Sequence, residues 1–135
     1  MLGSGFIGRF YTDSLHGYRN KDRVVSIYSR REKSAKKFAE DYDVSHWTTD
    51  MEESISHKDV DVVCISLPNN LHEEAVHLCC KHNKAVICTK PLGRTAEEAK
   101  RMVEAVEKAG IFAGYLEAVS YTHLRAHETE AELVC

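Results

Sequence analysis

Gly3-Ser4-Gly5-Phe6-Ile7-Gly8 is the stretch of this sequence that decides its fold, because it matches the pattern G-x-G-x-x-G. In a dinucleotide-binding turn, the first glycine permits a tight turn after a strand. The second lets a pyrophosphate approach the backbone, and the third lets the following helix pack closely on the strand. The phosphates then lie at the positive N-terminus of that helix. The motif predicts such a turn, and a glycine-rich turn without a ligand is the alternative that it leaves open by itself.

Outward from this loop, short apolar runs alternate with segments of helical period. The run at 61–67 is nearly all apolar after its first residue, as expected of a strand buried on both faces of a parallel sheet. We predict strands at 24–28, 61–67, 85–88 and 111–116, and helices at 33–42, 69–82 and 95–109. This alternation predicts an α/β fold of the Rossmann type, with a doubly wound parallel sheet.

The last predicted helix carries its own start and stop signals. Thr95 and Glu98 form a capping box, and Gly110 is the expected C-terminal stop. Its inner face is expected to carry Ala99, Met102, Val103 and Val106.

The second predicted strand ends at Ser29, Arg30 and Arg31, about 20 residues beyond Gly8, where a dinucleotide site recognises the adenosine ribose. An NAD site commonly has Asp or Glu at this position, which would repel a 2′-phosphate. A hydroxyl followed by guanidinium groups suits that phosphate instead. We therefore expect NADP or NAD as the cofactor, with NADP slightly preferred. The alternative is that the two arginines simply begin a solvated helix.

Two further motifs follow predicted strands: Leu67-Pro68-Asn69-Asn70-Leu71-His72 and Cys88-Thr89-Lys90-Pro91-Leu92. Both lie at carboxyl ends of strands, where an open α/β sheet binds its ligands. Together with the glycine loop, they resemble the Gfo/Idh/MocA family of nicotinamide-dependent oxidoreductases over about residues 1–117. The resemblance implies hydride transfer between the nicotinamide and a sugar, cyclitol or related hydroxy or carbonyl compound.

The resemblance also implies roles for single residues. The pyrophosphate would lie on Gly3, Gly5, Phe6, Ile7 and Gly8. The residues beside the nicotinamide half would be Pro68, Asn69 and His72. Lys90 matches the lysine of the family's E-K-P motif, so it is the expected catalytic residue and also a cofactor contact. Thr89 replaces the usual Glu of that motif. His72 could instead be only a first-turn residue of its helix, and Lys90 only a surface lysine.

Both ends of the chain depart from the family pattern. Only Met1 and Leu2 precede the glycine loop, so we expect the first strand to be mostly missing. We expect the family's second, substrate-binding domain to be absent and residues 1–117 alone to be an inactive, partial NAD(P)-binding domain. Residues 119–129 match the translation of a transposase-end sequencing adapter, and 133–135 continue it in frame after a barcode-length gap, although Glu132 departs from it. We expect 118–135 to be a non-native tail, with a genuine exposed helix as the alternative.

The composition excludes several classes of protein. A chain of 135 residues, 43% hydrophobic and 29% charged, forms one ordinary globular domain. The net charge of −3 gives no electrostatic reason to expect nucleic acid or a membrane as partner, and no run is long enough to span a bilayer. Five cysteines without a C-x-x-C pair indicate reduced thiols and a cytoplasmic location. Only His123 and His127 have i, i+4 spacing, and we expect no metal site.

Two rival functions share a similar loop. One is a non-catalytic NAD(P)-binding sensor or regulatory protein on the same fold. The other is a Rossmann-like methyltransferase, against which Lys90 and Pro91 argue. For a full-length member of the family, the resemblance implies a small-molecule substrate and a homo-oligomer.

Overall fold

The computed structural model describes residues 1–18 and 21–117, and the strands in this part of the chain all pair in parallel. The strands are β1 (Ser26–Tyr28), β2 (His46–Thr48), β3 (Val62–Ile65), β4 (Ala85–Thr89) and β5 (Ala113–Leu116). β1 pairs with β2, and β3, β4 and β5 form a three-stranded ladder in that order. The carboxyl ends of all five strands therefore point to the same edge, which is the edge that holds ligands in such sheets.

The first two residues join the two ladders into one sheet. Leu2 forms parallel bridges with Tyr28 of β1 and with Ile65 of β3. Its N–H donates to Cys64 O at 2.9 Å, and its carbonyl accepts from Ser66 N at 2.8 Å. Leu2 thus occupies the central position that the first strand of a Rossmann sheet occupies, and the order across the sheet is β2-β1-Leu2-β3-β4-β5.

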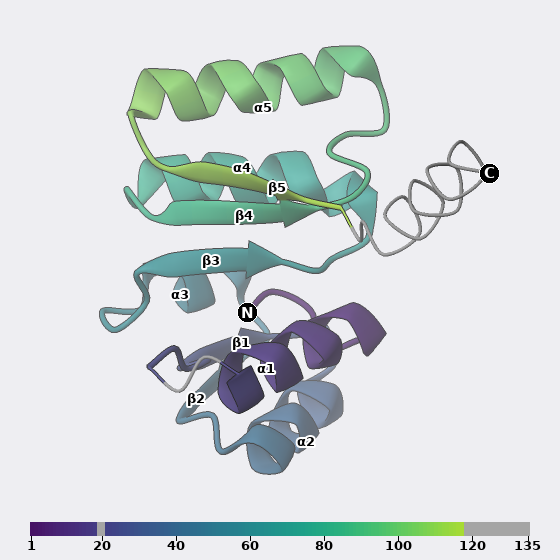
Figure 1. Ribbon diagram of the computed structural model, residues 1–135, viewed down its shortest axis with the longest axis vertical. Helices are drawn as coiled ribbons and strands as arrows, with labels where there is room; N and C mark the ends of the chain where they lie inside the picture. The colour runs from purple at the N-terminus through teal and green to yellow at the C-terminus, as the bar shows by residue number, and fades with distance from the viewer. Residues whose placement is uncertain (19–20, 118–135) are drawn as a thin grey trace, which may run out of the picture.

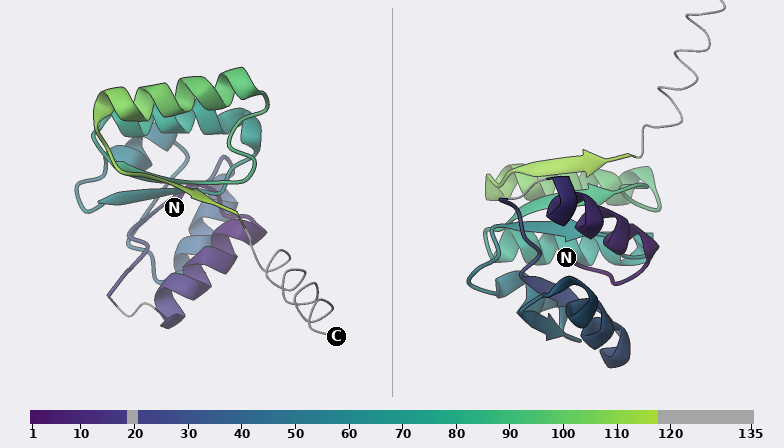
Figure 2. Two further views of the ribbon diagram at one scale, coloured as in Figure 1. Left: turned by 45° about the horizontal axis from the view of Figure 1, so that its top comes forward. Right: turned by 60° about the horizontal axis from the view of Figure 1, so that its bottom comes forward.

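Helices cover both faces of this sheet (Figures 1 and 2). They are α1 (Phe6–Tyr18), α2 (Glu32–Tyr42), α3 (Met51–Ser56), α4 (His72–Lys81) and α5 (Ala96–Ala109). On one face, α1 and α2 pack over a cluster that contains Met1, Ile27 and Phe38. On the other, α3, α4 and α5 pack over a larger cluster built around Leu2 and Ile65. Met1 and Leu2 point to opposite faces, as neighbouring residues of a strand do, and the doubly wound fold predicted from the sequence is confirmed.

The ends of the helices follow local chemistry. Thr95 caps α5 by accepting from Glu98 N at 3.2 Å, and Gly110 ends the helix with a φ of 67°. The Glu98 carboxylate does not close the capping box on Thr95. It accepts from the N–H of Arg94, one residue earlier, at 2.8 Å. The Thr95 cap and the Gly110 stop are confirmed, whereas the Glu98 half of the predicted capping box is wrong, because its carboxylate binds the loop before the helix instead.

Several predicted elements differ from the structure. The strands predicted at 24–28 and 61–67 shorten to three and four residues. The helix predicted at 69–82 divides into a 3₁₀ turn at Asn69–Leu71 and α4. β2 and α3 were missed. The prediction of Val103 on the inner face of α5 is wrong, because its side chain is 46% exposed; Met102 is the apolar residue of that helix that is fully buried. The tail predicted at 118–135 lies outside the described residues.

Candidate cofactor-binding site

Three stretches of the chain, within residues 3–9, 28–37 and 66–71, surround a cavity of about 730 Å³ at the carboxyl edge of the sheet. The predicted site residues that line it are Gly3, Gly5, Phe6, Ile7, Ser29, Arg30 and Pro68. Four other predicted residues do not line it, namely Gly8, Asn69, His72 and Lys90. The structure therefore brings together the residues predicted for the pyrophosphate and the ribose, and separates most of those predicted for the nicotinamide half.

The three glycines of the loop have different surroundings. A Cβ on Gly3 would lie 2.5 Å from Ser66 O, and the φ of Gly3 is +105°, which L side chains rarely adopt. A Cβ on Gly8 would lie 2.0 Å from Gly3 O. A Cβ on Gly5 would meet nothing within 4 Å. Gly3 and Gly8 are thus required by the packing of the protein itself, whereas the bare backbone of Gly5 faces open space.

The N-terminus of α1 suits an anion. The first N–H groups of an α-helix have no partner within the helix, and the helix dipole makes this end positive. No acidic residue lies in the first turn of α1. A pyrophosphate fits this arrangement, because Gly5 leaves room for it directly before the helix begins at Phe6.

The end of β1 presents one hydroxyl and two guanidinium groups. Ser4 Oγ donates to Ser29 Oγ at 2.8 Å, so Ser29 keeps its own proton to donate to a ligand. Arg30 and Arg31 line the cavity and are exposed. Neither guanidinium has an ion-pair partner among the described residues. These groups are available to an incoming anion.

Two other cations of the cavity are already engaged. Arg9 on α1 donates to Asp41 Oδ2 at 2.8 Å, and Lys37 donates to Asp41 Oδ1 at 2.9 Å. Hydrogen bonds from Arg9 and Lys37 lower the pKa of Asp41. The Arg9 guanidinium also lies over the Phe38 ring, 5.4 Å from its centroid. Sequence reasoning missed Arg9, Lys33, Ser34 and Lys37 as lining residues. All four lie in the first two turns of α1 or α2, and this shared position was the signal that could have identified them.

His72 lies inside the protein rather than on the cavity wall. Its ring is 1% exposed. Nε2 lies 2.9 Å from Leu67 O, and Nδ1 lies 3.0 Å from Pro91 O and 3.2 Å from Leu92 O. The ring therefore contacts main-chain oxygens of the loops that follow β3 and β4.

Lys90 follows β4 directly and is exposed. Its N–H donates to Leu116 O on β5 at 3.1 Å, which fixes its backbone at the sheet edge. The neighbouring Thr89 is buried, and its hydroxyl donates to Ile65 O at 2.9 Å. Thr89 therefore faces the sheet, and the Lys90 ammonium has no ion-pair partner within residues 1–18 and 21–117.

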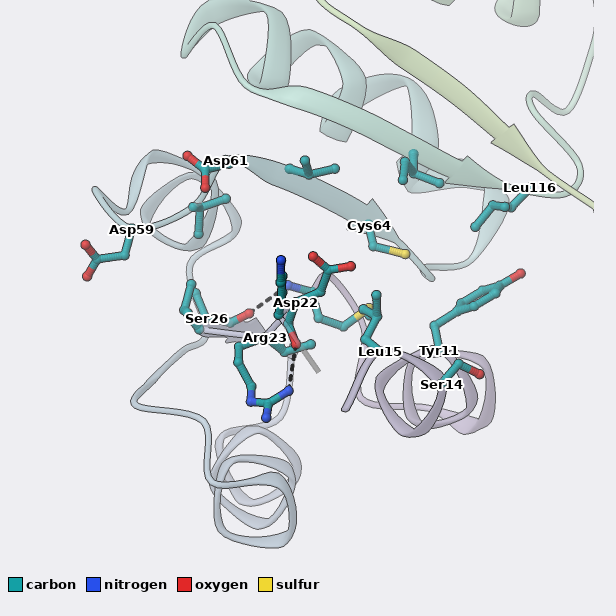
Figure 3. Close-up of a pocket in the computed structure, with 17 residues that line it drawn as sticks. Tyr11, Ser14, Leu15, Asp22, Arg23, Ser26, Asp59, Asp61, Cys64 and Leu116 are labelled. Atoms are coloured by element: carbon teal, nitrogen blue, oxygen red, sulfur yellow. Dashed lines mark hydrogen bonds between the residues drawn. The ribbon is translucent and has the colours of Figure 1, made fainter. Parts of the chain in front are cut away.

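A second cavity, of about 530 Å³, lies between α1 and the face of β3, β4 and β5 that α4 and α5 leave uncovered (Figure 3). Tyr11 and Leu15 of α1 line one side, and Cys64 and Leu116 line the other. The cavity extends to the segments that precede β1 and β3, including the carboxylates of Asp59 and Asp61. It lacks the glycine loop and the strand-end cations, so it does not suit a dinucleotide.

The thiols and metal-type ligands of the described residues are further candidates for a second site. Burial raises the pKa of Cys79 and of Cys88 to about 12, so both thiols are protonated at neutral pH. No cluster of three or more metal-type side chains occurs among the described residues. His123 and His127 lie outside them. Within the same described part of the chain, none of the helices has the length and apolar character to cross a membrane.

The parallel sheet and the glycine loop define a dinucleotide-binding Rossmann domain. A family model described as an oxidoreductase family with an NAD-binding Rossmann fold matches residues 1–115. The chain belongs to this family, the Gfo/Idh/MocA oxidoreductases, and contains its NAD-binding domain.

Relatives with known names support the same class. The chain is 32% identical over 120 residues to trans-1,2-dihydrobenzene-1,2-diol dehydrogenase of Bos taurus, covering 88% of this chain and 35% of the relative. It is 31% identical to the NADP(+)-dependent scyllo-inositol 2-dehydrogenase of Bacillus subtilis over 76% of this chain and 30% of the relative. A solved levoglucosan dehydrogenase in complex with NADH and levoglucosan superposes with a TM-score of 0.75 at 29% identity, over 83% of this chain and 33% of the other. The chain thus spans about a third of the length of its relatives.

Proposed function

We propose that this domain, within a chain of the length of its relatives, serves an NAD(P)-dependent oxidoreductase acting on the CH–OH group of a sugar, cyclitol or related compound. The observation that carries the proposal is the open backbone at Gly5 in front of the α1 N-terminus. A closely packed loop with one bare position is what a bound pyrophosphate requires, and a ligand-free turn would have no need of it.

The residues of this chain would bind and orient the reactants. The N–H groups at the start of α1 would hold the pyrophosphate, and the loop at Pro68 would border the nicotinamide half. The bound nicotinamide would supply the hydride chemistry. Lys90 would donate a hydrogen bond to the reacting oxygen, stabilising the negative charge that develops there.

Binding by the 135-residue chain tests the proposal directly. We expect titration calorimetry to detect NADP⁺ or NAD⁺, and Gly5→Val to abolish binding because its side chain fills the open space. Gly17→Ala is the matched control, since a Cβ at Gly17 also meets nothing within 4 Å but lies at the far end of α1. Equal affinity of Gly5→Val and the unaltered chain would contradict the assignment of the loop.

We infer a preference for NADP over NAD. Arg30 and Arg31 are exposed at the cavity, and the Ser29 hydroxyl retains a proton to donate. Arg31 is also the N-cap residue of α2, so the positive end of a second helix faces the same place. These groups support binding of a dianionic 2′-phosphate. The ratio of the affinities for NADP⁺ and NAD⁺ tests the inference.

One observation favours a second function, a non-catalytic NAD(P)-binding sensor. Thr89 stands where the E-K-P motif has Glu, and its hydroxyl bonds to Ile65 O within the sheet. No carboxylate is therefore supplied beside Lys90 from this position. Cofactor binding without turnover of any sugar or cyclitol, in a chain of full family length, would establish the sensor.

The remaining inferences concern the setting of the protein. The cysteines of the described residues are all free, which supports a reducing, cytoplasmic environment. We infer a small-molecule substrate and, for a chain of full family length, a homo-oligomer.

A further inference from the structure

The imidazole of His72 lies between two loops and contacts the main chain of both. Leu67, whose carbonyl lies 2.9 Å from Nε2, directly precedes Pro68. Pro91 and Leu92, whose carbonyls lie 3.0 and 3.2 Å from Nδ1, directly follow Lys90. One buried ring thus lies between the loop at the end of β3 and the loop that carries Lys90.

A second contact fixes the far end of the Lys90 loop. The Glu98 carboxylate on α5 accepts from Arg94 N at 2.8 Å and pairs with the Arg94 guanidinium. A Cβ on Gly93 would lie 2.8 Å from Ala99 N, so the loop lies directly against the start of α5. Glu98 thus holds one end of the loop, and the His72 ring contacts the main chain at the end next to Lys90.

An apolar side chain at position 72 could fill the space of the imidazole and would need no hydrogen-bond partner. Burying an imidazole is favourable only when its nitrogens find partners, and every buried side-chain N or O of the described residues has one. A ring nitrogen that carries a proton donates to the main-chain oxygen beside it, from Nε2 to Leu67 O or from Nδ1 to Pro91 O and Leu92 O. The polar ring therefore specifies where the loops lie, which hydrophobic packing alone does less sharply.

We propose that His72 is a positioning residue, which acts on the nicotinamide end of the site through Leu67, Pro91 and Leu92 rather than by touching the cofactor. The proposal rests on the proposed function, because it assumes that a dinucleotide binds along this edge. Affinity for the adenosine end of the dinucleotide should therefore not depend on His72.

Comparing ADP-ribose with the reduced dinucleotides distinguishes binding at the two ends of the site. ADP-ribose contains the adenosine and pyrophosphate without the nicotinamide, whereas NADH and NADPH contain all three. We expect His72→Gln and His72→Asn to weaken the better-bound of the two reduced dinucleotides by about tenfold, and ADP-ribose by less than about threefold. Amide exchange at Lys90 and Leu92 should also quicken in both variants. His77→Gln is the matched control, since His77 lies on the same helix and is exposed.

The outcomes are distinguishable. Failure of the unaltered chain to bind ADP-ribose and both reduced dinucleotides would overturn the proposed function itself. Equal loss for ADP-ribose and dinucleotide, or no loss for either, would overturn the positioning role alone. If neither variant folds, NMR on the unaltered chain tests the proposal instead. The resonances of the His72 ring and of the Leu67 and Leu92 amides should shift when the reduced dinucleotide binds but not when ADP-ribose binds. Identical shifts with both ligands would overturn the proposal.

Discussion

The two halves of the sheet differ in the side chains that follow their strands at the carboxyl edge. At the end of β1, Arg30 and Arg31 are exposed beside the cavity. At the ends of β3 and β4, His72 and Thr89 are buried and hydrogen bonded to main-chain oxygens. The β1–β2 half therefore offers charge to a ligand, while the β3–β5 half uses its polar groups to fix the shape of its own loops.

The two halves should therefore respond differently to substitution. An exposed charge contributes to affinity and can be removed without disturbing the fold. A buried hydrogen bond, when broken, leaves an unsatisfied group and costs about 1 to 3 kcal/mol. Lys90 is the exception in its half, because it is exposed and without an ion-pair partner among the described residues.

Replacing Lys90 with Met tests that exception and has the largest expected effect. In a chain of full family length, we expect kcat to fall by about 100-fold or more, because the ammonium acts on charge that develops in the transition state. The Kd for the cofactor should stay within a few-fold. Steady-state kinetics and calorimetry measure the two quantities, with Lys100→Met, an exposed lysine of α5, as the control. An unchanged kcat would make Lys90 an ordinary surface residue.

Gly8→Ala tests the junction between the halves. Its Cβ would lie 2.0 Å from Gly3 O, and backbone at that point cannot move aside easily. We expect the free energy of unfolding to fall by about 3 kcal/mol, at the upper end for overpacking. Urea denaturation measures the loss, and Gly17→Ala should change stability by less than about 1 kcal/mol. Similar values for the two variants would mean that Gly8 does not hold α1 against the loop.

The sequence predicted the exposed half of the site better than the buried half. Gly3, Gly5 and Arg30 were predicted from motif and spacing, and all three line the cavity. The burial of His72 was not recognisable, since its partners Leu67, Pro91 and Leu92 are backbone oxygens that carry no residue-type signal. β2 and α3 were missed for a related reason: strands of three residues and helices of six are too short to show a period.

The amine of Met1 gives a pH test of the centre of the sheet. In the 135-residue chain with a free amine on Met1, burial lowers the pKa of that amine from 8.0 to about 6, while the amine donates to Ser26 O at 2.7 Å. The unfolded chain binds the proton more readily between these two values, so stability is full above about pH 8 and falls as the pH drops to about 6. The expected loss is about 3 kcal/mol.

Chemical denaturation across this range measures the loss, and acetylation of the amine is the control. Acetylation removes the titration of the amine and leaves that of His16, whose pKa burial also lowers. The difference between the two chains isolates Met1. Parallel pH profiles would show that the amine is not buried between β1 and β3.

Arg30→Ala tests the charged half and has the smallest expected effect. One exposed guanidinium bound to a phosphate contributes about 1 to 2 kcal/mol, so the Kd for NADP⁺ should rise by about tenfold. The Kd for NAD⁺ should change by less than about twofold, because NAD⁺ has no 2′-phosphate for Arg30 to bind. Stability should not change, since the side chain has no ion-pair partner among residues 1–18 and 21–117.

Salt supplies an independent check on the same variant. Raising the ionic strength screens exposed charges, so the ratio of the Kd for NAD⁺ to the Kd for NADP⁺ should fall in the unaltered chain. In the Arg30→Ala variant, the same ratio should change less. Arg9→Ala provides the contrast: Arg9 is paired with Asp41 and lies over Phe38, so its loss should lower stability as well as affinity. An Arg30→Ala variant that keeps its full affinity for NADP⁺ would assign the charge recognition to Arg31 or to the start of α2.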